Sequence, residues 1–306
     1  MPALTRPIVR LLTINTGSSS LKAAVYERGG AEKRTLAISV ERIGHADSRI
    51  HITDAGGAML LDRQQAVPDH GEALRTLFAW LHTERSDPPF DAVGHRVVYG
   101  GMHHREPERM TDALVAALRE LTVIDPDHLP QALDAIGTVG ESYPGLPQVA
   151  CFDTAFHRQM PQVATLYALP QEYADAGVIR YGFHGLSYEY IMQALRTEDR
   201  AAADGRVIVA HLGSGASMAA VHGGIGVETT MGFTPTGGLV MGTRVGDLDP
   251  SVPLYLVRSR GMTPDDVSAL LNTHAGMLGV SGTSGDVRDL LERALRPEWR
   301  KDHLQI

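Results

Sequence analysis

Short apolar runs separated by polar turns make up the first part of the chain. Leu11, Leu12 and Ile14 precede a turn of one glycine and three serines, and KAAVYE resumes an extended pattern directly after that turn. This pattern predicts strand, turn, strand. AVGHRVVYGG and PQVACFDT have the same character and are predicted to be strands that end in polar groups. Ends of strands are where α/β proteins place their sites.

Apolar periodicity then predicts three amphipathic helices. The first follows Asp69 as its N-cap, the second follows Thr111, and the third follows Thr263 with Pro264 in its first turn and Gly276 as its end. The stripes that we expect to face the core are Leu74, Leu77, Phe78 and Leu81 in the first helix, Leu114, Leu118 and Leu121 in the second, and Val267, Leu270 and Leu271 in the third.

The first strand-turn-strand unit is repeated later in the chain. The segment TINTGSSSLKAAVYER aligns with VAHLGSGASMAAVHGG, which pairs Gly17 with Gly213 and Ser18 with Ser214. An internal repeat at this separation predicts two similarly built halves rather than a short-period solenoid.

A turn of this composition suits phosphate. Gly17 lets the backbone approach closely, and successive N–H groups and serine hydroxyls can form an anion-binding concavity. The alternative is an ordinary Gly/Ser hairpin turn. It is not a Walker loop, because only Gly17 precedes Lys22 and no amphipathic helix follows.

Composition narrows the classes of function. The 306 residues are 43% hydrophobic, enough for about two buried cores. A net charge of -8 without long basic runs disfavours broad binding to nucleic acid or anionic membranes, and we expect neither as a partner. The single cysteine, Cys151, allows no internal disulfide, and the chain has no signal peptide or membrane-length apolar stretch, so we predict a cytoplasmic protein.

Dense polar clusters follow the predicted strands. Each has a plain alternative: Arg96 or Arg244 in a surface ion pair, His184 as a structural histidine, and Asp153 as a helix cap. The clusters, in chain order, are GHRVVYGG, FDTAFH, YGFHG, HLGSGAS and MGFTPTGGLVMGTRVGDLDP.

Taken together, these motifs closely resemble the acetate kinase family. The matching segments run from residue 14 to residue 289 and are INTGSSSLK, GHRVVYGG, FDTAFHRQMP, RYGFHGLSYEY, HLGSGAS, MGFTPTGGLVMGTRVGD and GMLGVSGTSGDVRD. The resemblance implies an α/β protein with a duplicated actin-like ATPase (ribonuclease H-like) fold. It also implies two domains, residues 1–152 and 153–306, around a nucleotide cleft.

The resemblance also implies roles for the residues that match the motifs. Asn15 and Asp153 would lie by Mg²⁺ and the transferring phosphoryl group, Arg96 and Arg244 would hold carboxylate and phosphoryl oxygens, and His184 would stabilise developing charge. The implied nucleotide contacts are Asn15, Ser18, Lys22, His211, Gly213, Ser214 and Gly215 at the phosphates and Asp286 and Arg288 near the adenosine. The implied acyl-pocket residues are Val98 and Pro235, beside Arg96.

The chain departs from the family pattern in several places. Ser214 and Tyr99 replace an asparagine and a histidine of the family motifs. Asp127 aligns with an apolar residue of the acyl pocket, where a carboxylate would be a poor neighbour for a methyl group. The family continues past GDVRD through an adenosine loop and a magnesium-linked glutamate that this sequence lacks, so we expect the second domain to be incomplete.

The sequence therefore predicts a kinase that uses ATP and Mg²⁺ to phosphorylate acetate reversibly, giving acetyl phosphate and ADP. A homodimer is expected if the protein is complete. The alternatives are a weakly active or non-catalytic remnant of such a kinase, or a kinase for another short acid such as propionate.

Overall fold

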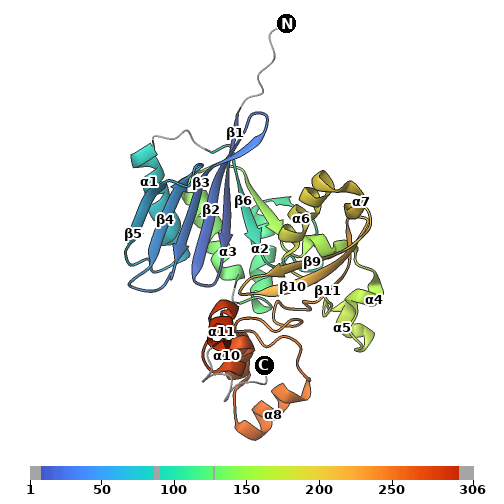
Figure 1. Cartoon of the computed structure of the whole chain (residues 1–306). Helices are drawn as coiled ribbons and strands as arrows, with labels where there is room; N and C mark the ends of the chain where they lie inside the picture. Colours follow the sequence, from blue (N-terminus) through green and yellow to red (C-terminus); the bar gives the residue numbers. More distant parts are fainter. Residues whose placement is uncertain (1–7, 86–89, 127, 296–306) are drawn as a thin grey trace. The chain divides into compact units, whose positions relative to one another are not determined.

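The computed structural model describes residues 8–85, 90–126 and 128–295 (Figure 1). The chain divides into two compact units, Met1–Ala155 and Phe156–Ile306. Asp127 lies outside the described residues, so its place in an acyl pocket stays a prediction.

The first unit is built on an eight-stranded sheet with the order β5-β4-β3-β2-β1-β6-β8-β7. Strands β1 to β5 form an antiparallel meander, whereas β1, β6 and β8 run parallel to one another. The strands are β1 Val9–Thr16, β2 Ser20–Arg28, β3 Glu32–Glu41, β4 Arg49–Asp54, β5 Met59–Gln64, β6 Ala92–Val97, β7 Glu108–Arg109 and β8 Gln148–Phe152.

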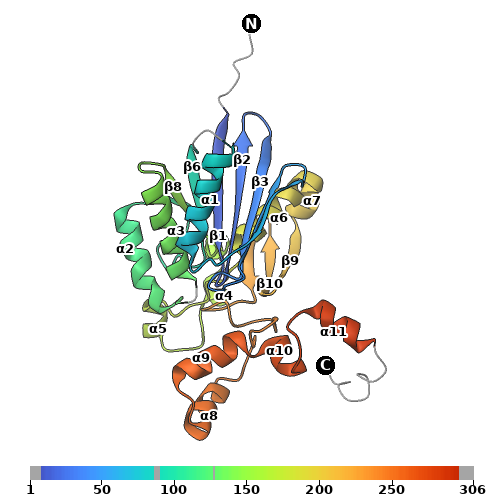
Figure 2. The same cartoon turned by 90° about the vertical axis from the view of Figure 1, so that its left-hand side faces the viewer.

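Alternating side chains give this sheet one buried face. Leu12 and Ile14 of β1 are buried while Thr13 between them is exposed, as a strand with one face on a core requires. Helices α1 and α3 pack on the buried face and on each other, as Figure 2 shows. The helical segments are α1 His70–Trp80, η1 Leu81–Arg85, α2 Asp112–Glu120, η2 Leu121–Val123 and α3 Leu129–Ser142, and η3 Ala155–Gln159 follows β8.

The predicted helices of this unit are confirmed. Asp69 caps α1 by accepting a hydrogen bond from the Glu72 backbone N–H at 2.7 Å, and Thr111 caps α2 in the same way. The predicted stripe of α1 is buried. Leu121 lies just beyond the end of α2 and is only partly buried.

The second unit carries a three-stranded antiparallel sheet with the order β11-β10-β9. Helix α6 packs against it through the buried side chains of Tyr188 and Met192. The elements of this unit are α4 Gln162–Thr165, α5 Gln171–Asp175, α6 Gly185–Glu198, α7 Arg200–Ala203, β9 Arg206–Leu212, β10 Ala216–His222, β11 Ile225–Thr229, α8 Ser251–Arg260, α9 Pro264–Thr273, α10 Gly276–Ser281 and α11 Val287–Ala294.

The predicted repeat is a real structural repeat, but its two hairpins differ in register. Thr16 pairs with Leu21 across the first turn, whereas Leu212 pairs with Ala216 across the second, which is one residue shorter. A shift of one residue reverses the faces of a strand. Accordingly, the residue that aligns with exposed Thr13 is the buried Val209.

Helix α9 starts as predicted and ends earlier than predicted. Thr263 and Asp266 form a reciprocal capping box, but the C-cap is His274, and Gly276 opens α10 instead of ending α9. Gly276 has a φ of +63°, and a Cβ atom there would lie 2.3 Å from the Met241 carbonyl oxygen. The glycine is required by this close backbone approach.

None of the helices in the described part of the chain is long and apolar enough to cross a membrane.

Candidate active site

In the first unit, three predicted site residues meet where the parallel strands end. Asn15 is the penultimate residue of β1, Arg96 is the penultimate residue of β6, and Asp153 directly follows β8. Nε of Arg96 donates to Asp153 at 3.0 Å, with Nη2 also donating to Asp153, and Nη1 donates to Oδ1 of Asn15 at 2.9 Å. The parallel strands therefore build a cluster of a cation, a carboxylate and an amide.

Burial makes this cluster electrostatically tight. The Asp153 side chain is only 2% exposed and that of Arg96 is 26% exposed. Burial pulls the pKa of Arg96 down, but the charge of Asp153, the hydrogen bonds to it and the charge of Asp125 outweigh burial, so the pKa lies above its ordinary value. The guanidinium therefore stays charged and is positioned to bind an anion.

Asp125 is a second buried carboxylate near this cluster. One of its oxygens accepts a hydrogen bond from Nδ1 of His128 at 2.8 Å. The other oxygen is buried and has no hydrogen-bond partner among the described residues. Asp125 thus adds negative charge beside Arg96 that the sequence motifs did not indicate.

His95, the neighbour of Arg96 on β6, faces the opposite side and is buried. Its Nε2 donates to Oε1 of Gln148 at 2.7 Å. Burial lowers the pKa of His95 to about 4, although the hydrogen bond to Gln148 opposes the shift. His95 is a neutral structural histidine, and its neutral form stabilises the fold.

The first glycine turn is supported from α1. The backbone N–H of Gly17 donates to the Ser20 carbonyl at 2.7 Å, and Nε2 of His70 donates to the Gly17 carbonyl at 2.8 Å. Ser18 at the tip is exposed. His70 contacts the turn through carbonyl oxygens, and Ser18 and Ser19 remain exposed, as an anion-holding turn needs.

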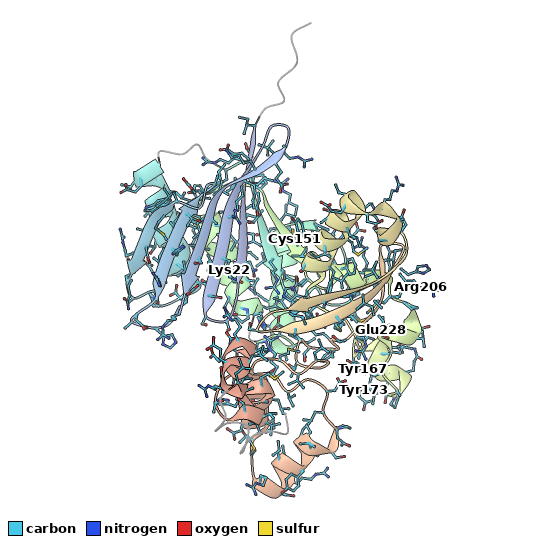
Figure 3. All side chains as sticks on the ribbon, in the orientation of Figure 1. Lys22, Cys151, Tyr167, Tyr173, Arg206 and Glu228 are labelled. Atoms are coloured by element: carbon cyan, nitrogen blue, oxygen red, sulfur yellow. The ribbon has the colours of Figure 1, made fainter. Side chains whose placement is uncertain are left out.

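Lys22 lies on β2, opposite Asn15 in the β1–β2 register (Figure 3). Both residues line an open cavity of about 350 Å³ on the solvent face of the sheet. Val98 follows β6 and is buried, as is Tyr99. The structure therefore places Asn15 and Lys22 on one surface, and Val98 does not line this cavity.

In the second unit, His184 begins α6 in a left-handed backbone conformation, with φ 60° and ψ 20°. Nδ1 of its ring lies 2.8 Å from Oγ of Ser217 on β10, and Ser217 in turn contacts the Tyr188 hydroxyl. A left-handed residue other than glycine is strained and is commonest at functional positions.

His184 and His211 stack on each other beside the second glycine turn. Their ring centroids are 4.0 Å apart with an interplanar angle of 20°, and Nδ1 of His211 lies 3.0 Å from Oγ of Ser187. A Cβ atom placed on Gly215 would lie 3.4 Å from Nη1 of Arg244 and 3.6 Å from Nε2 of His184. The predicted histidines and arginine therefore converge on the predicted phosphate turn.

Nη1 of Arg244 donates to the Pro235 carbonyl at 3.1 Å. Pro235 and Arg244 were predicted from different ends of one long motif, and the structure brings them together. The turn that carries Gly213 and Ser214 is exposed.

The last motif approaches the same turn through its backbone. The N–H of Gly242 donates to the Ser214 carbonyl at 3.2 Å, and a Cβ on Gly242 would lie 3.0 Å from the Gly285 carbonyl. Asp286 caps α11, and Arg288 pairs with it at 2.8 Å in solvent. These last two side chains are close to each other and are exposed.

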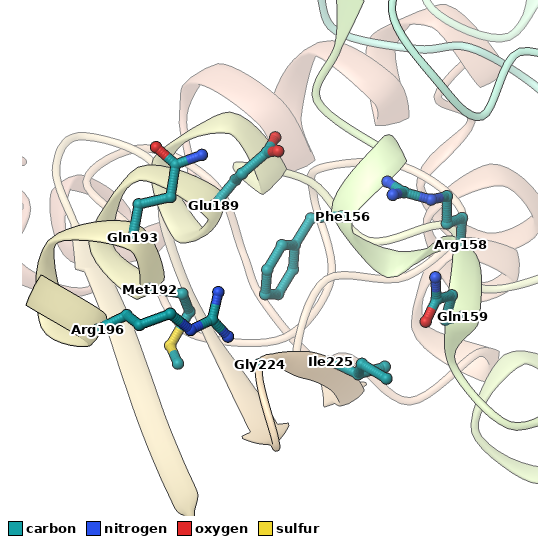
Figure 4. Close-up of a pocket in the computed structure, with 9 residues that line it drawn as sticks. All are labelled: Phe156, Arg158, Gln159, Glu189, Met192, Gln193, Arg196, Gly224 and Ile225. Atoms are coloured by element: carbon teal, nitrogen blue, oxygen red, sulfur yellow. The ribbon is translucent and has the colours of Figure 1, made fainter. Parts of the chain in front are cut away.

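A further pocket of the second unit lies away from all these residues. It has a volume of about 180 Å³ between η3, α6 and the β10–β11 turn (Figure 4). Phe156 and Met192 give it an apolar floor, and Arg158, Arg196 and Glu189 lie at its rim. None of the predicted site residues lines it.

Sequence reasoning missed the residues that hold the site from behind. His70 and Asp125 lie in stretches that read as ordinary helix and loop, although His70 contacts the Gly17 carbonyl and the charge of Asp125 acts on Arg96. Tyr188 and Ser217 lie within the motifs RYGFHGLSYEY and HLGSGAS, but nothing in those motifs marked them as partners of His184. For Ser217 the available signal was a polar residue in an apolar strand, since buried polar groups require a partner.

Comparison with known proteins places this geometry in context. The model of the acetokinase family matches residues 10–301. Acetate kinase of Methylocella silvestris is 43% identical over 290 residues, which are 92% of this chain and 72% of that protein. Acetate kinase of Rhodopseudomonas palustris is 45% identical over 287 residues, again 92% of this chain and 72% of that protein.

Solved structures agree with these matches. The acetate kinase of Porphyromonas gingivalis superposes with a TM-score of 0.83 at 33% identity, over 97% of this chain and 75% of that one. A propionate kinase of Francisella tularensis gives 0.88 at 30% identity, over 97% of this chain and 77% of that one. The predicted family resemblance and the predicted α/β, actin-like fold are both confirmed.

Proposed function

We propose, since this chain belongs to the acetokinase family, that it transfers the γ-phosphoryl group of ATP to acetate and forms acetyl phosphate and ADP reversibly. The observation that carries the proposal is the Arg96 cluster. A partly buried arginine fork lies between a buried carboxylate and an amide at the ends of three parallel strands. Such a fork can exchange one of its protein partners for the carboxylate of a small acid.

Phosphoryl transfer requires the protein to position the reactants and to stabilise charge, rather than to form a covalent bond with them. Arg96 in the first unit and Arg244 in the second would neutralise carboxylate and phosphoryl oxygens with their planar forks. His184 would donate a hydrogen bond to an oxygen on which charge develops. Asp153 would orient Arg96 and the acceptor carboxylate.

The two glycine turns would hold the nucleotide phosphates. Ser18 and Lys22 belong to the first turn and its following strand, and His211, Gly213, Ser214 and Gly215 to the second. Asp286 and Arg288 would lie near the adenosine, which is supported by the packing of Gly285 against Gly242. Exposed backbone N–H groups and hydroxyls suit a polyphosphate.

Asn15 and Asp153 would hold Mg²⁺. Their oxygen atoms already share one cation, the Arg96 guanidinium, so the donor set suits a hard cation. The described residues contain no cluster of three or more histidine, cysteine, aspartate or glutamate side chains that would hold a metal without help from a substrate. When bound, Mg²⁺ would supply charge neutralisation at the phosphate oxygens.

The acyl pocket is proposed to lie at Val98 and Pro235. Acetate is the expected acid, and propionate is the alternative because a neighbour of similar structure is a propionate kinase. An extra methylene changes binding by about 1 to 3 kcal/mol. Comparing kcat/KM for the two acids therefore decides between them.

The test is a hydroxamate assay with acetate, ATP, Mg²⁺ and hydroxylamine. We expect hydroxamate that depends on acetate and on ATP, with ADP formed in equal amount. ATP hydrolysis that is independent of any carboxylate would favour an ATPase, and no turnover of a folded chain would favour the non-catalytic alternative. Adding EDTA should stop the reaction, and restoring Mg²⁺ should recover it.

We also infer that the protein acts in the cytoplasm as a homodimer and that the boundary between its two actin-like domains falls between residues 152 and 153 of the sequence. Light scattering on the purified chain measures the oligomer, with twice the monomer mass expected. Limited proteolysis maps the boundary, since exposed connections between domains are cut first.

A further inference from the structure

We propose that Ser217 and Tyr188 are positioning residues that fix the tautomer of His184, so that Nε2 carries the proton. The role of His184 as a donor in this inference rests on the proposed kinase function. Ser217 and Tyr188 are both fully buried, at 0% exposure. The serine hydroxyl lies between Nδ1 of His184, at 2.8 Å, and the Tyr188 hydroxyl.

The direction of this hydrogen-bond chain follows from acidity. A phenol has a pKa near 10 and is a stronger acid than an aliphatic alcohol, so Tyr188 donates and the serine oxygen accepts. The serine proton then points to its other partner, Nδ1 of His184. A neutral imidazole that accepts at Nδ1 carries its proton on Nε2.

Nε2 is the nitrogen that faces the second glycine turn. It lies 3.6 Å from the place of a Cβ on Gly215, and Nη1 of Arg244 lies 3.4 Å from the same point. With the proton on Nε2, the imidazole and the guanidinium both present N–H donors to this point. That arrangement suits a phosphoryl oxygen, for which preorganised donors are most effective.

The backbone around His184 is held as firmly as its ring. The Tyr188 backbone N–H donates to the His184 carbonyl at 3.1 Å, so one residue supports both the ring and the helix start. Nε2 of buried His157 donates to the Phe183 carbonyl at 3.0 Å, one residue before His184. These contacts compensate for the left-handed conformation of His184.

The neighbouring His211 provides an internal comparison. Its Nδ1 also lies near a serine hydroxyl, that of Ser187 at 3.0 Å, but Ser187 is only partly buried and no tyrosine hydroxyl is seen to contact it within the described residues. The three-member chain is therefore a feature of His184. Removing Ser187 should disturb His211 and the binding of ATP more than the chemical step.

Nitrogen NMR of histidine-labelled full-length protein measures the tautomer directly, with the His184 signals assigned by a His184→Gln variant. We expect Nε2–H in the parent chain and a mixture of tautomers in Ser217→Ala, while Ser187→Ala leaves the His184 tautomer unchanged. Nδ1–H in the parent chain, or an unchanged tautomer in Ser217→Ala, would overturn the proposal. This readout does not depend on kinase activity, so failure of the proposed function is seen separately.

Kinetics supply the second measurement. In Ser217→Ala and in Tyr188→Phe, kcat should fall about tenfold to a hundredfold, because a small misalignment of the His184 donor lowers the rate by about that factor. KM for ATP should stay unchanged, and the pH profile of kcat should shift. Unchanged kcat and pH profile in folded Ser217→Ala contradict the proposal. Tyr188→Phe keeps the ring, so a fall in its kcat without a change in thermal unfolding separates positioning from packing.

Discussion

Two arginines of the candidate site have different contacts. Arg96 in the first unit donates to the buried carboxylate of Asp153 and to Asn15, whereas Nη1 of Arg244 in the second unit donates to the backbone carbonyl of Pro235. Loss of Arg96 would leave the buried carboxylate of Asp153 without its counter-ion. Arg96 therefore contributes to folding as well as to the candidate site.

The two glycine turns differ in a related way. Gly17 is backed by His70 from α1, and a Cβ there would meet the movable Ser20 side chain at 2.8 Å. Gly215 is backed by Arg244 and His184. The first turn is therefore held by its scaffold, and the second is in direct contact with the groups proposed to do the chemistry.

The largest expected effect comes from replacing the arginines. Arg244→Ala and Arg96→Ala should each lower kcat by about three to five decades, or about 4 to 7 kcal/mol, as removal of an arginine finger does. Arg96→Ala should also lower the free energy of unfolding, by about 3 kcal/mol, because Asp153 stays buried without its counter-ion. Steady-state kinetics and urea unfolding measure the two effects.

The control for this comparison is Arg258→Ala, which removes an exposed arginine of α8. It should change neither quantity. Near-normal turnover in Arg244→Ala would refute its role in the site. Unchanged stability of Arg96→Ala would refute the role of Arg96 as the counter-ion of Asp153.

Acid should destabilise the first unit through His95. Its pKa in the folded chain is about 4, against an ordinary histidine pKa of 6.5, so between these pH values the unfolded chain binds a proton that the folded chain does not. The contribution of His95 is complete above pH 6.5 and falls by about 3 kcal/mol as the pH drops to 4. Urea unfolding of the parent and of His95→Met as a function of pH tests this, and an equally steep decline in the variant would contradict it.

Replacing one glycine of each turn by alanine compares how much kcat depends on each turn. Gly215→Ala should lower kcat about a hundredfold, because its Cβ would occupy the point that lies 3.4 Å from Nη1 of Arg244 and 3.6 Å from Nε2 of His184, where we propose that both groups donate to a phosphoryl oxygen. Gly17→Ala should have a smaller kinetic effect, since Ser20 can rotate away, and should change stability by no more than about 1 kcal/mol. Equal losses of kcat in the two variants would contradict this prediction, because they would mean that both turns lie equally close to the reacting groups.

The smallest effects concern helix caps. Asp69→Ala and Thr263→Ala should each cost about 1 kcal/mol. The loss at Asp69 should appear in global unfolding, because α1 buries Leu74 and Leu77 in the core. The loss at Thr263 should appear only as faster amide exchange in α9, which buries Val267 alone among its described residues. A global effect of Thr263→Ala would place α9 in the cooperative core.

Periodicity explains why much of the fold could be predicted. Strand alternation around Leu12 and Ile14 and the helical spacing of Leu74 and Leu77 are local signals that report directly which face is buried. The order of strand ends then brought Asn15, Arg96 and Asp153 within reach of one another.

Other features depend on contacts that no local pattern carries. Gly276 looks like a helix end, but its role is to let the backbone pass close to Met241. The register difference between the hairpins is set by how many residues each turn takes, and the aligned sequences around Gly17 and Gly213 do not reveal it. Ser217 reads as a strand residue, and its partners come from a helix that starts some thirty positions earlier.

The left-handed backbone at His184 has a consequence for engineering. Glycine adopts this conformation without the penalty of about 1 to 2 kcal/mol that other residues incur. His184→Gly would remove this penalty but would leave the buried Ser217 hydroxyl without its imidazole partner, so the two effects should nearly cancel in the free energy of unfolding. A glycine at position 184 would therefore give a protein of nearly unchanged heat resistance that lacks the imidazole proposed to serve the reaction.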